Sequence, residues 1–115
     1  MIKSDEERIK KIISTWEALK GQIIDKNLGA DKILQNEYDQ WAVTTPLYNI
    51  GEHAYNISNE LKKKYPDVPW KLVSGLRNRL VHDYEGINWN IIVEVLFSEM
   101  EEFVKKVSDM QEENF

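Results

Sequence analysis

Eight consecutive residues bring together two arginines, an asparagine, a histidine and a tyrosine, side chains that can do proton-transfer or phosphate chemistry. They read Arg77-Asn78-Arg79-Leu80-Val81-His82-Asp83-Tyr84 and lie shortly before Gly86. Histidine titrates near neutral pH, so it can accept or donate a proton under physiological conditions, whereas arginine keeps its charge and binds phosphate oxygens through a two-point fork. These residue types, so close together, predict a site that handles phosphate.

The same segment has a simpler interpretation. A histidine near the C-terminal end of a helix often only compensates the helix dipole, and an arginine such as Arg79 often pairs with an acid four residues on, here Asp83. Because short motifs frequently match by chance, spacing alone favours this simpler interpretation.

Length and composition limit the class of protein. At 115 residues the chain can form one domain, residues 1–115, with its own core. It has no cysteine, which excludes disulfides and thiolate metal sites and fits a reducing cytoplasm. The first residues are charged, and no segment approaches the ~18 apolar residues of a membrane span. We therefore expect a soluble cytoplasmic protein with no membrane contact.

The charge balance limits how the chain can meet nucleic acid. Twenty acidic residues against fifteen basic ones give a formal charge of −5. Proteins that coat long nucleic acids usually show the opposite balance, because neutralisation of phosphates supplies their affinity. Any contact with RNA must therefore be local. The basic residues that can form a local patch are Lys62, Lys63, Lys64, Lys71, Arg77, Arg79 and His82.

Apolar residues recur at three- and four-residue spacing along most of the chain, which predicts an all-α, up-down bundle of four helices. The first helix begins near Ser4 and ends before a turn at residues 27–29. The third covers about residues 70–83, and the fourth follows Asn88 as its N-cap.

The second helix is predicted to be long, from about residue 30 to residue 65. It contains Pro46, and a proline inside a helix removes a hydrogen bond and clashes with the preceding turn. We expect one helix kinked at Pro46; the alternative is a new helix capped by Thr44 or Thr45. Gly51 lies in mid-helix, where it costs up to ~1 kcal/mol relative to alanine, so we also expect another helix to approach closely there.

On an ideal third helix, apolar and polar residues fall on opposite faces. The expected core face consists of Leu72, Val73, Leu76 and Leu80. The polar face carries Lys71, Ser74, Asn78 and His82. Arg77 is about 140° from His82 around the helix, so one helix cannot easily aim both at one phosphate. Either the helix unwinds near Val81, or a two-fold dimer brings two copies of the motif into one cleft.

A row of aromatic residues bears on the same choice. Trp41, Tyr48 and Tyr55 recur every seven residues along the second helix. They form either extra core or a dimer contact, and the periodicity favours core.

Three parts of the sequence resemble the HEPN superfamily and, within it, the HepT-like toxin ribonucleases. Arg77, four intervening residues and His82, followed by Asp83 and Tyr84, are similar to the family motif, which closes with His-x-Tyr. The other two parts are Leu47-Tyr48-Asn49-Ile50-Gly51-Glu52-His53-Ala54 and Pro66-Asp67-Val68-Pro69-Trp70 with Gly75-Leu76-Arg77-Asn78. The resemblance runs from about residue 33 onward and implies a two-fold dimer of HEPN type.

With this family in view, each polar residue of the motif can be assigned a role. Arg77 binds the phosphate and stabilises the charge that builds on it, and His82 transfers a proton. Asn78 and Lys71 bind or orient the substrate, and Glu52 supports Arg77 through a salt bridge. The resemblance implies that RNA is cut by attack of its 2′-hydroxyl. We expect no metal or other cofactor, because the sequence shows no cluster of ligands.

Tyr84 stands where the resemblance places the tyrosine that a partner antitoxin, a minimal nucleotidyltransferase, modifies with AMP. A nucleotide there would add bulk and negative charge beside His82 and repel an RNA phosphate. The simpler interpretation of Tyr84 is packing at the helix end. His53 replaces the small residue usual after Gly-Glu in this family, and we interpret it as a helix-surface or interface histidine.

Two other interpretations stay open. A non-catalytic HEPN module would bind a nucleotide or act as the accessory subunit of a nucleotidyltransferase, and a structural dimerisation domain would do neither. The presence of Arg77, His82 and Tyr84 together favours the endoribonuclease.

Overall fold

Helices form most of the chain that the structure, a computed structural model, describes, which is residues 3–81 and 86–115. The helices are α1 (Lys3–Asp25), α2 (Ala30–Gln35), α3 (Glu37–Tyr55), α4 (Asn59–Lys64), α5 (Trp70–Val81), α6 (Trp89–Glu94), the π-helical segment η1 (Val95–Glu99) and α7 (Met100–Asn114). These residues contain no strand. The all-α prediction is therefore confirmed.

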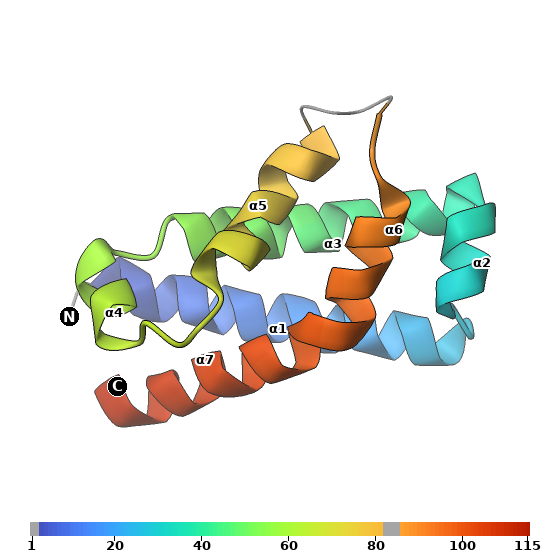
Figure 1. Ribbon diagram of the computed structural model, residues 1–115. Helices are drawn as coiled ribbons and strands as arrows, with labels where there is room; N and C mark the ends of the chain where they lie inside the picture. The colour runs from blue at the N-terminus through green and yellow to red at the C-terminus, as the bar shows by residue number, and fades with distance from the viewer. Residues whose placement is uncertain (1–2, 82–85) are drawn as a thin grey trace.

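One apolar core joins the helices. In Figure 1, α1, α3 and α7 lie along the long direction of the molecule, and α5 crosses over α3. Helix α3 packs against both α1 and α5, and α1 also contacts α7. Fully buried side chains in this core include Ile12, Leu47, Ile50, Leu76 and Phe103. Burying a side chain of this kind contributes about 1.5–3 kcal/mol, so the stacked α1, α3 and α5 form the frame that carries the motif.

The prediction of one long second helix, and with it the count of four helices, is wrong. The chain leaves the helix at Asn36 and again at residues 56–58, so α2, α3 and α4 replace one element. The side chain of Asn36 accepts hydrogen bonds from Tyr38 N at 2.8 Å and from Asp39 N at 3.3 Å. An asparagine that caps a new helix in this way competes with continuation of the previous one.

The second break is held from a distance by α1. Ser58 caps α4 by accepting a hydrogen bond from Leu61 N at 3.2 Å. Asp5, which is only 1% exposed, accepts hydrogen bonds from Ser58 N at 2.9 Å and from Ser58 Oγ at 2.6 Å. A carboxylate can be buried here because these hydrogen bonds satisfy it. Local spacing within residues 30–65 could not reveal this tertiary contact.

Two features of α3 bear on the predictions. Pro46 lies inside the helix without ending it, so the alternative of a new helix after Thr44 or Thr45 is wrong, while the kink at Pro46 stays a prediction. Gly51 is buried, and a Cβ atom there would lie 2.9 Å from Arg77 N and 3.0 Å from Val73 O. Glycine therefore allows the backbone of α5 to approach α3 closely, and Arg77 lies at the point of approach.

The last predicted helix is divided. Asn88 caps α6, as predicted, by accepting a hydrogen bond from Asn90 N at 3.1 Å. In Figure 1, α6 and α7 run in different directions, with the π-helical segment η1 between them. A π segment is a known cause of a bend, since its wider turn interrupts the regular hydrogen-bond pattern.

Some residues predicted for the core are exposed. Trp41 and Tyr55 are 52% and 51% exposed, so the core interpretation is wrong for both, while Tyr48 packs partly against the core. Leu72 of α5 is also exposed, at 39%. The other predicted core residues of α5 are buried: Val73, Leu76 and Leu80.

Across residues 3–81 and 86–115, no helix combines the length and apolar character needed to cross a membrane.

Candidate functional site

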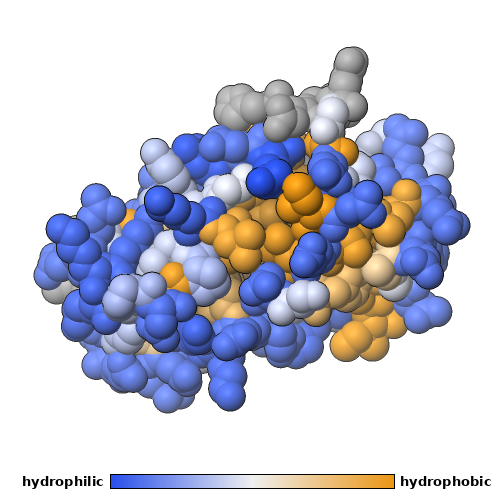
Figure 2. Space-filling view, viewed as in Figure 1, coloured by the Kyte–Doolittle hydropathy of each residue, from blue (hydrophilic) through white to orange (hydrophobic). Residues whose placement is uncertain are grey.

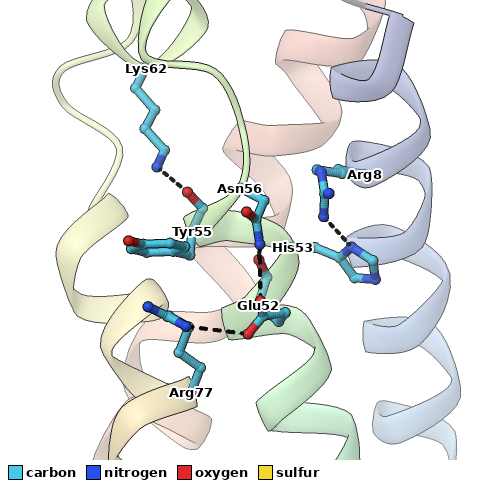
Figure 3. Close-up of polar contacts among 7 residues, drawn as sticks. All are labelled: Arg8, Glu52, His53, Tyr55, Asn56, Lys62 and Arg77. Atoms are coloured by element: carbon cyan, nitrogen blue, oxygen red, sulfur yellow. Dashed lines mark hydrogen bonds and ion pairs between the residues drawn. The ribbon is translucent and has the colours of Figure 1, made fainter.

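Arg77 lies on α5 where that helix crosses α3, and two residues of α3 contact its side chain. Arg77 Nη1 is 3.5 Å from Glu52 Oε2, and the guanidinium carbon is 3.6 Å from the centroid of the Tyr55 ring. Figure 3 shows both neighbours beside the guanidinium. Glu52 and Tyr55 share one face of α3 because they are three residues apart. The predicted ion pair between Arg77 and Glu52 is present.

The end of α3 holds Glu52 in place. Asn56 Nδ2 donates hydrogen bonds to Glu52 Oε1 at 3.0 Å and to Glu52 O at 2.9 Å. The side chains of Arg77 and Glu52 are 24% and 34% exposed, so their attraction is screened less than that of a fully solvated pair. The guanidinium is thereby fixed before any ligand arrives.

Arg77 keeps hydrogen-bonding capacity in spite of these contacts. A guanidinium carries five N–H donors, and the ion pair runs through Nη1. Arg77 Nε is buried and has no hydrogen-bond partner among the described residues. Because Nε is buried, the exposed part of the guanidinium, at its Nη groups, is the part suited to bind an oxyanion such as phosphate.

Tyr55 also holds a second cation, Lys62 of α4. Lys62 Nζ donates a hydrogen bond to Tyr55 O at 2.9 Å and lies 5.7 Å from the centroid of the Tyr55 ring. In Figure 3, Lys62 and Arg77 approach the ring from opposite sides. Burial lowers the pKa of Lys62, and the charge of Asp5 opposes this shift. Tyr55 therefore joins two positive side chains from different helices.

Two further predicted residues line the same groove as Arg77. This hollow, called the α4–α5 groove below, has a volume of about 820 Å³ and is bordered by α4, residues 66–69 and α5. Lys71 and Asn78 line it from α5, and Lys62 lines it from α4. The structure thus brings together three of the predicted site residues, Arg77, Lys71 and Asn78.

The remaining predicted site residues, His82 and Tyr84, lie outside the described residues. Their roles, and the choice between an unwound helix and a dimer, stay predictions.

The sequence analysis included Lys62 in a possible basic patch but did not predict its contact with Tyr55, and it gave Tyr55 no role in this site. Tyr55 belongs to an aromatic row, and Lys62 belongs to a run of lysines that usually marks a solvated helix end. One signal was available for Tyr55, since a residue three positions after Glu52 shares its helix face. No comparable signal exists for the contact of Lys62 with Tyr55, because that contact depends on how α4 packs.

His53 follows Glu52 on α3 but contacts α1. Its Nδ1 is 3.4 Å from Arg8 Nη1, as Figure 3 shows. Burial, followed by the charges of Arg8 and Lys11, lowers the pKa of His53 from its usual 6.5, and Glu52 opposes the shift. His53 is therefore a partly buried contact between two helices. Within residues 3–81 and 86–115, no group of three or more His, Asp or Glu side chains could hold a metal ion.

Comparison with known proteins identifies the family. The sequence profile described as "Ribonuclease HepT-like" matches residues 2–110, which is nearly the whole chain. The chain therefore belongs to the ribonuclease HepT-like family, and this membership supports ribonuclease activity at the level of the family. No solved structure matches the chain.

Curated relatives have similar descriptions. The chain is 35% identical over 80 residues to "Putative RNase MJ0127" of Methanocaldococcus jannaschii, a match that covers 70% of this chain and 66% of the relative. It is 38% identical over 69 residues to "Putative RNase TTE0752" of Caldanaerobacter subterraneus subsp. tengcongensis, covering 60% and 62%. It is 32% identical over 62 residues to "Probable ribonuclease HepT" of Thermococcus cleftensis, covering 54% and 56%. The matches span less than two thirds of the length of these relatives.

Proposed function

We propose that this chain is a cytoplasmic endoribonuclease that cuts RNA by attack of a ribose 2′-hydroxyl on the adjacent phosphate, without a metal ion. The observation that carries the proposal is the position of Arg77, held by Glu52 and Tyr55 at the edge of the α4–α5 groove. A charged fork that is fixed in advance stabilises developing charge without reorganising during the reaction. We assign proton transfer to His82.

The proposed reaction exchanges one phosphorus–oxygen bond for another. A base accepts the proton of the 2′-hydroxyl, whose oxygen attacks phosphorus and forms a phosphorane. The bond from phosphorus to the 5′-oxygen then breaks, and an acid protonates that oxygen. The products are an RNA end with a 2′,3′-cyclic phosphate and an RNA end with a 5′-hydroxyl. Arg77 stabilises the additional negative charge of the phosphorane.

This reaction needs two proton-transfer groups, whereas the motif contains one histidine. We therefore propose a two-fold dimer in which Arg77 and His82 of both subunits share one cleft. Exposed apolar side chains on α5 and η1 support this assembly: Val81 and Phe97. Figure 2 shows an apolar area on the face where Figure 1 places α5 and α6. Exposed patches of this kind commonly mark protein interfaces.

Cleavage assays on a purified protein and an unstructured RNA test the proposal. His82→Ala should slow cleavage by about a hundred- to ten-thousand-fold, the usual effect of losing a general acid or base. Arg77→Lys keeps the charge but loses the fork, so it should also lose most activity. The wild type should cut at an undiminished rate in EDTA and leave a cyclic phosphate.

Two results would overturn this mechanism: cleavage at the wild-type rate by His82→Ala, or loss of wild-type cleavage in EDTA. The chain would then be better described as a module that binds a nucleotide or a partner protein. Unfolding curves of each variant separate a loss of chemistry from a loss of fold.

We further propose that Tyr84 is the site at which a cognate minimal nucleotidyltransferase antitoxin switches the enzyme off by adding AMP. The support is the spacing of His82, Asp83 and Tyr84, which puts the added negative charge next to the proton-transfer residue. Intact-mass measurement after incubation with this partner and ATP should show an adduct on the wild type and none on Tyr84→Phe. An adduct on the variant would assign the modification to another residue.

A further inference from the structure

The α4–α5 groove differs in charge from the chain as a whole. Its lining includes three cations, Lys62, Lys71 and Arg77, and none of the described residues that line it is Asp or Glu. The complete chain, by contrast, has twenty acidic and fifteen basic residues and a formal charge of −5. Positive charge collected in one hollow of an acidic protein focuses the local potential and attracts an anionic ligand there.

Between its cations the groove presents apolar surface and amides. Apolar lining residues are Val68, Pro69, Trp70 and Leu72, of which Leu72 is exposed while Val68 and Trp70 are largely buried and form the floor. The Trp70 indole is fixed in position because its Nε1 donates a hydrogen bond to Tyr65 O at 3.0 Å. Asn59 and Asn78 add side-chain amides to the lining. Cations for the phosphates, with apolar surface and amides for unstacked bases, are the features that grooves for single-stranded nucleic acid share.

The groove runs along α5 toward the part of the helix that carries Arg77. Lys71 and Asn78 are seven residues apart on α5, so they share a face and are separated by about 10 Å along the helix axis. Arg77 lies beside Asn78 at the motif end of this line. A strand lying along α5 therefore passes Lys71 before it reaches the arginine assigned to the phosphate that is cut.

We propose that the α4–α5 groove binds a single-stranded RNA segment next to the scissile phosphate, with Lys62 and Lys71 pairing with its backbone phosphates. This inference rests on the proposed RNA cleavage and adds the surface that receives the flanking nucleotides. Tyr55 is a positioning residue in this arrangement. Its ring contacts Arg77 and its carbonyl accepts a hydrogen bond from Lys62, so it fixes the groove cation relative to the motif arginine.

The salt dependence of RNA binding tests the groove directly. An RNA oligonucleotide with 2′-O-methyl groups cannot make the attack and can be titrated with wild-type protein. Each phosphate contact to a single strand contributes a slope of about −0.7 in log K against log salt concentration. The double variant Lys62→Gln/Lys71→Gln should therefore have a slope shallower by about 1.4 and a lower affinity at low salt. Loss of only the affinity, with an unchanged slope, would contradict the proposed phosphate contacts.

A charge-matched variant provides the control. Lys10 and Lys105 are exposed and do not line the groove, and Lys10→Gln/Lys105→Gln removes the same charge. This variant should keep the wild-type slope. If the groove variant and the control behave alike, the groove proposal is overturned.

Cleavage of an unmodified RNA separates the two proposals. If the wild type cuts RNA but the groove variant cuts and binds as the control does, the groove proposal fails alone. If the wild type binds RNA with a slope that depends on Lys62 and Lys71 but does not cut, the proposed nuclease function fails and the groove stands as an RNA-binding surface.

Discussion

Tyr55 shows that a residue outside the motif can determine where the motif arginine lies. Tyr55 is 51% exposed and adds little to the core, yet its ring packs against the guanidinium of Arg77. A cation–π contact at a partly exposed site contributes about 0.5–1 kcal/mol. This energy is small compared with the stability of a domain. It nevertheless acts on the guanidinium of Arg77, the group proposed to stabilise the negative charge of the transition state.

Substitutions of Tyr55 should therefore affect cleavage according to whether they keep the ring. Tyr55→Leu should lower kcat/KM for RNA about two- to five-fold, the rate equivalent of 0.5–1 kcal/mol. Tyr55→Phe keeps the ring and should retain activity. Initial rates on one RNA, with unfolding curves as a check on the fold, measure the difference. Equal losses in both variants would show that the hydroxyl, and not the ring, is the important group.

His53 should make the stability of the domain depend on pH. Its folded-state pKa is lowered from 6.5 by burial and then by Arg8 and Lys11, so between the two values the unfolded chain binds more protons. The stabilising effect of the neutral ring is thus complete above pH 6.5 and is lost as pH falls through the lowered value.

The free energy of unfolding in urea at about pH 7.5 and about pH 5.5 measures this dependence. Between the higher and the lower pH, the free energy of unfolding should decrease less for His53→Gln than for the wild type. The same decline in both proteins would assign the dependence to other groups.

Among the elements, the crossing of α3 and α5 decides where Arg77 lies. Gly51→Ala would place a Cβ atom 2.9 Å from Arg77 N and 3.0 Å from Val73 O. Both are backbone atoms, so α5 has to shift. Overpacking of this kind costs about 1–3 kcal/mol, more than the gain of up to ~1 kcal/mol from helix propensity. Urea unfolding should show a net loss of stability, and cleavage should fall because Arg77 moves with its helix.

Gly21 in α1 is the matched control for Gly51. A Cβ atom there meets nothing within 4 Å, so Gly21→Ala should stabilise the protein by up to ~1 kcal/mol. If Gly51→Ala were as stable as Gly21→Ala, the two helices would not need glycine at their crossing.

Element boundaries were predictable where neighbouring residues cause them. The turn at residues 27–29 and the cap at Asn88 depend on local chemistry, and the structure contains both. The gap between α3 and α4 depends on Asp5, which lies far away in the sequence and reaches Ser58 only when α1 has packed. The spacing of apolar residues within 30–65 therefore could not predict the contact between Asp5 and Ser58.

The same distinction applies to the candidate site. The ion pair of Arg77 with Glu52 could be expected, because Gly51 indicates where another helix comes close. The contact of Lys62 with Tyr55 could not, since it follows from the break that turns α4 toward α5. Local patterns thus predicted the residues of the motif, and tertiary packing decided which neighbours surround it.

For the whole molecule, the proposed dimer predicts a solution mass of two chains. Light scattering at micromolar concentration should give this mass for the wild type. Phe97 is an exposed apolar residue of η1, and Phe97→Glu should shift the mass toward one chain and lower cleavage, because a charge is costly in an apolar interface. Ile24→Glu, at an exposed apolar position near the end of α1, should leave the mass unchanged. A wild-type mass of one chain would rule out the dimer.

The contact between Asp5 and Ser58 joins positions that are 53 residues apart in the sequence. A helix of six residues, such as α4, is too short to persist by itself, so it lasts only while α1 stays packed against it. The wall of the groove that carries Lys62 therefore opens together with the first helix, as one cooperative unit. In native-state hydrogen exchange, the protected amides of α4 should exchange at rates set by the unfolding of α1, whereas faster, independent exchange would show that α4 opens alone. A segment fused ahead of Asp5 could thus alter RNA binding at a groove whose nearest lining residue, Tyr55, is fifty positions away along the chain.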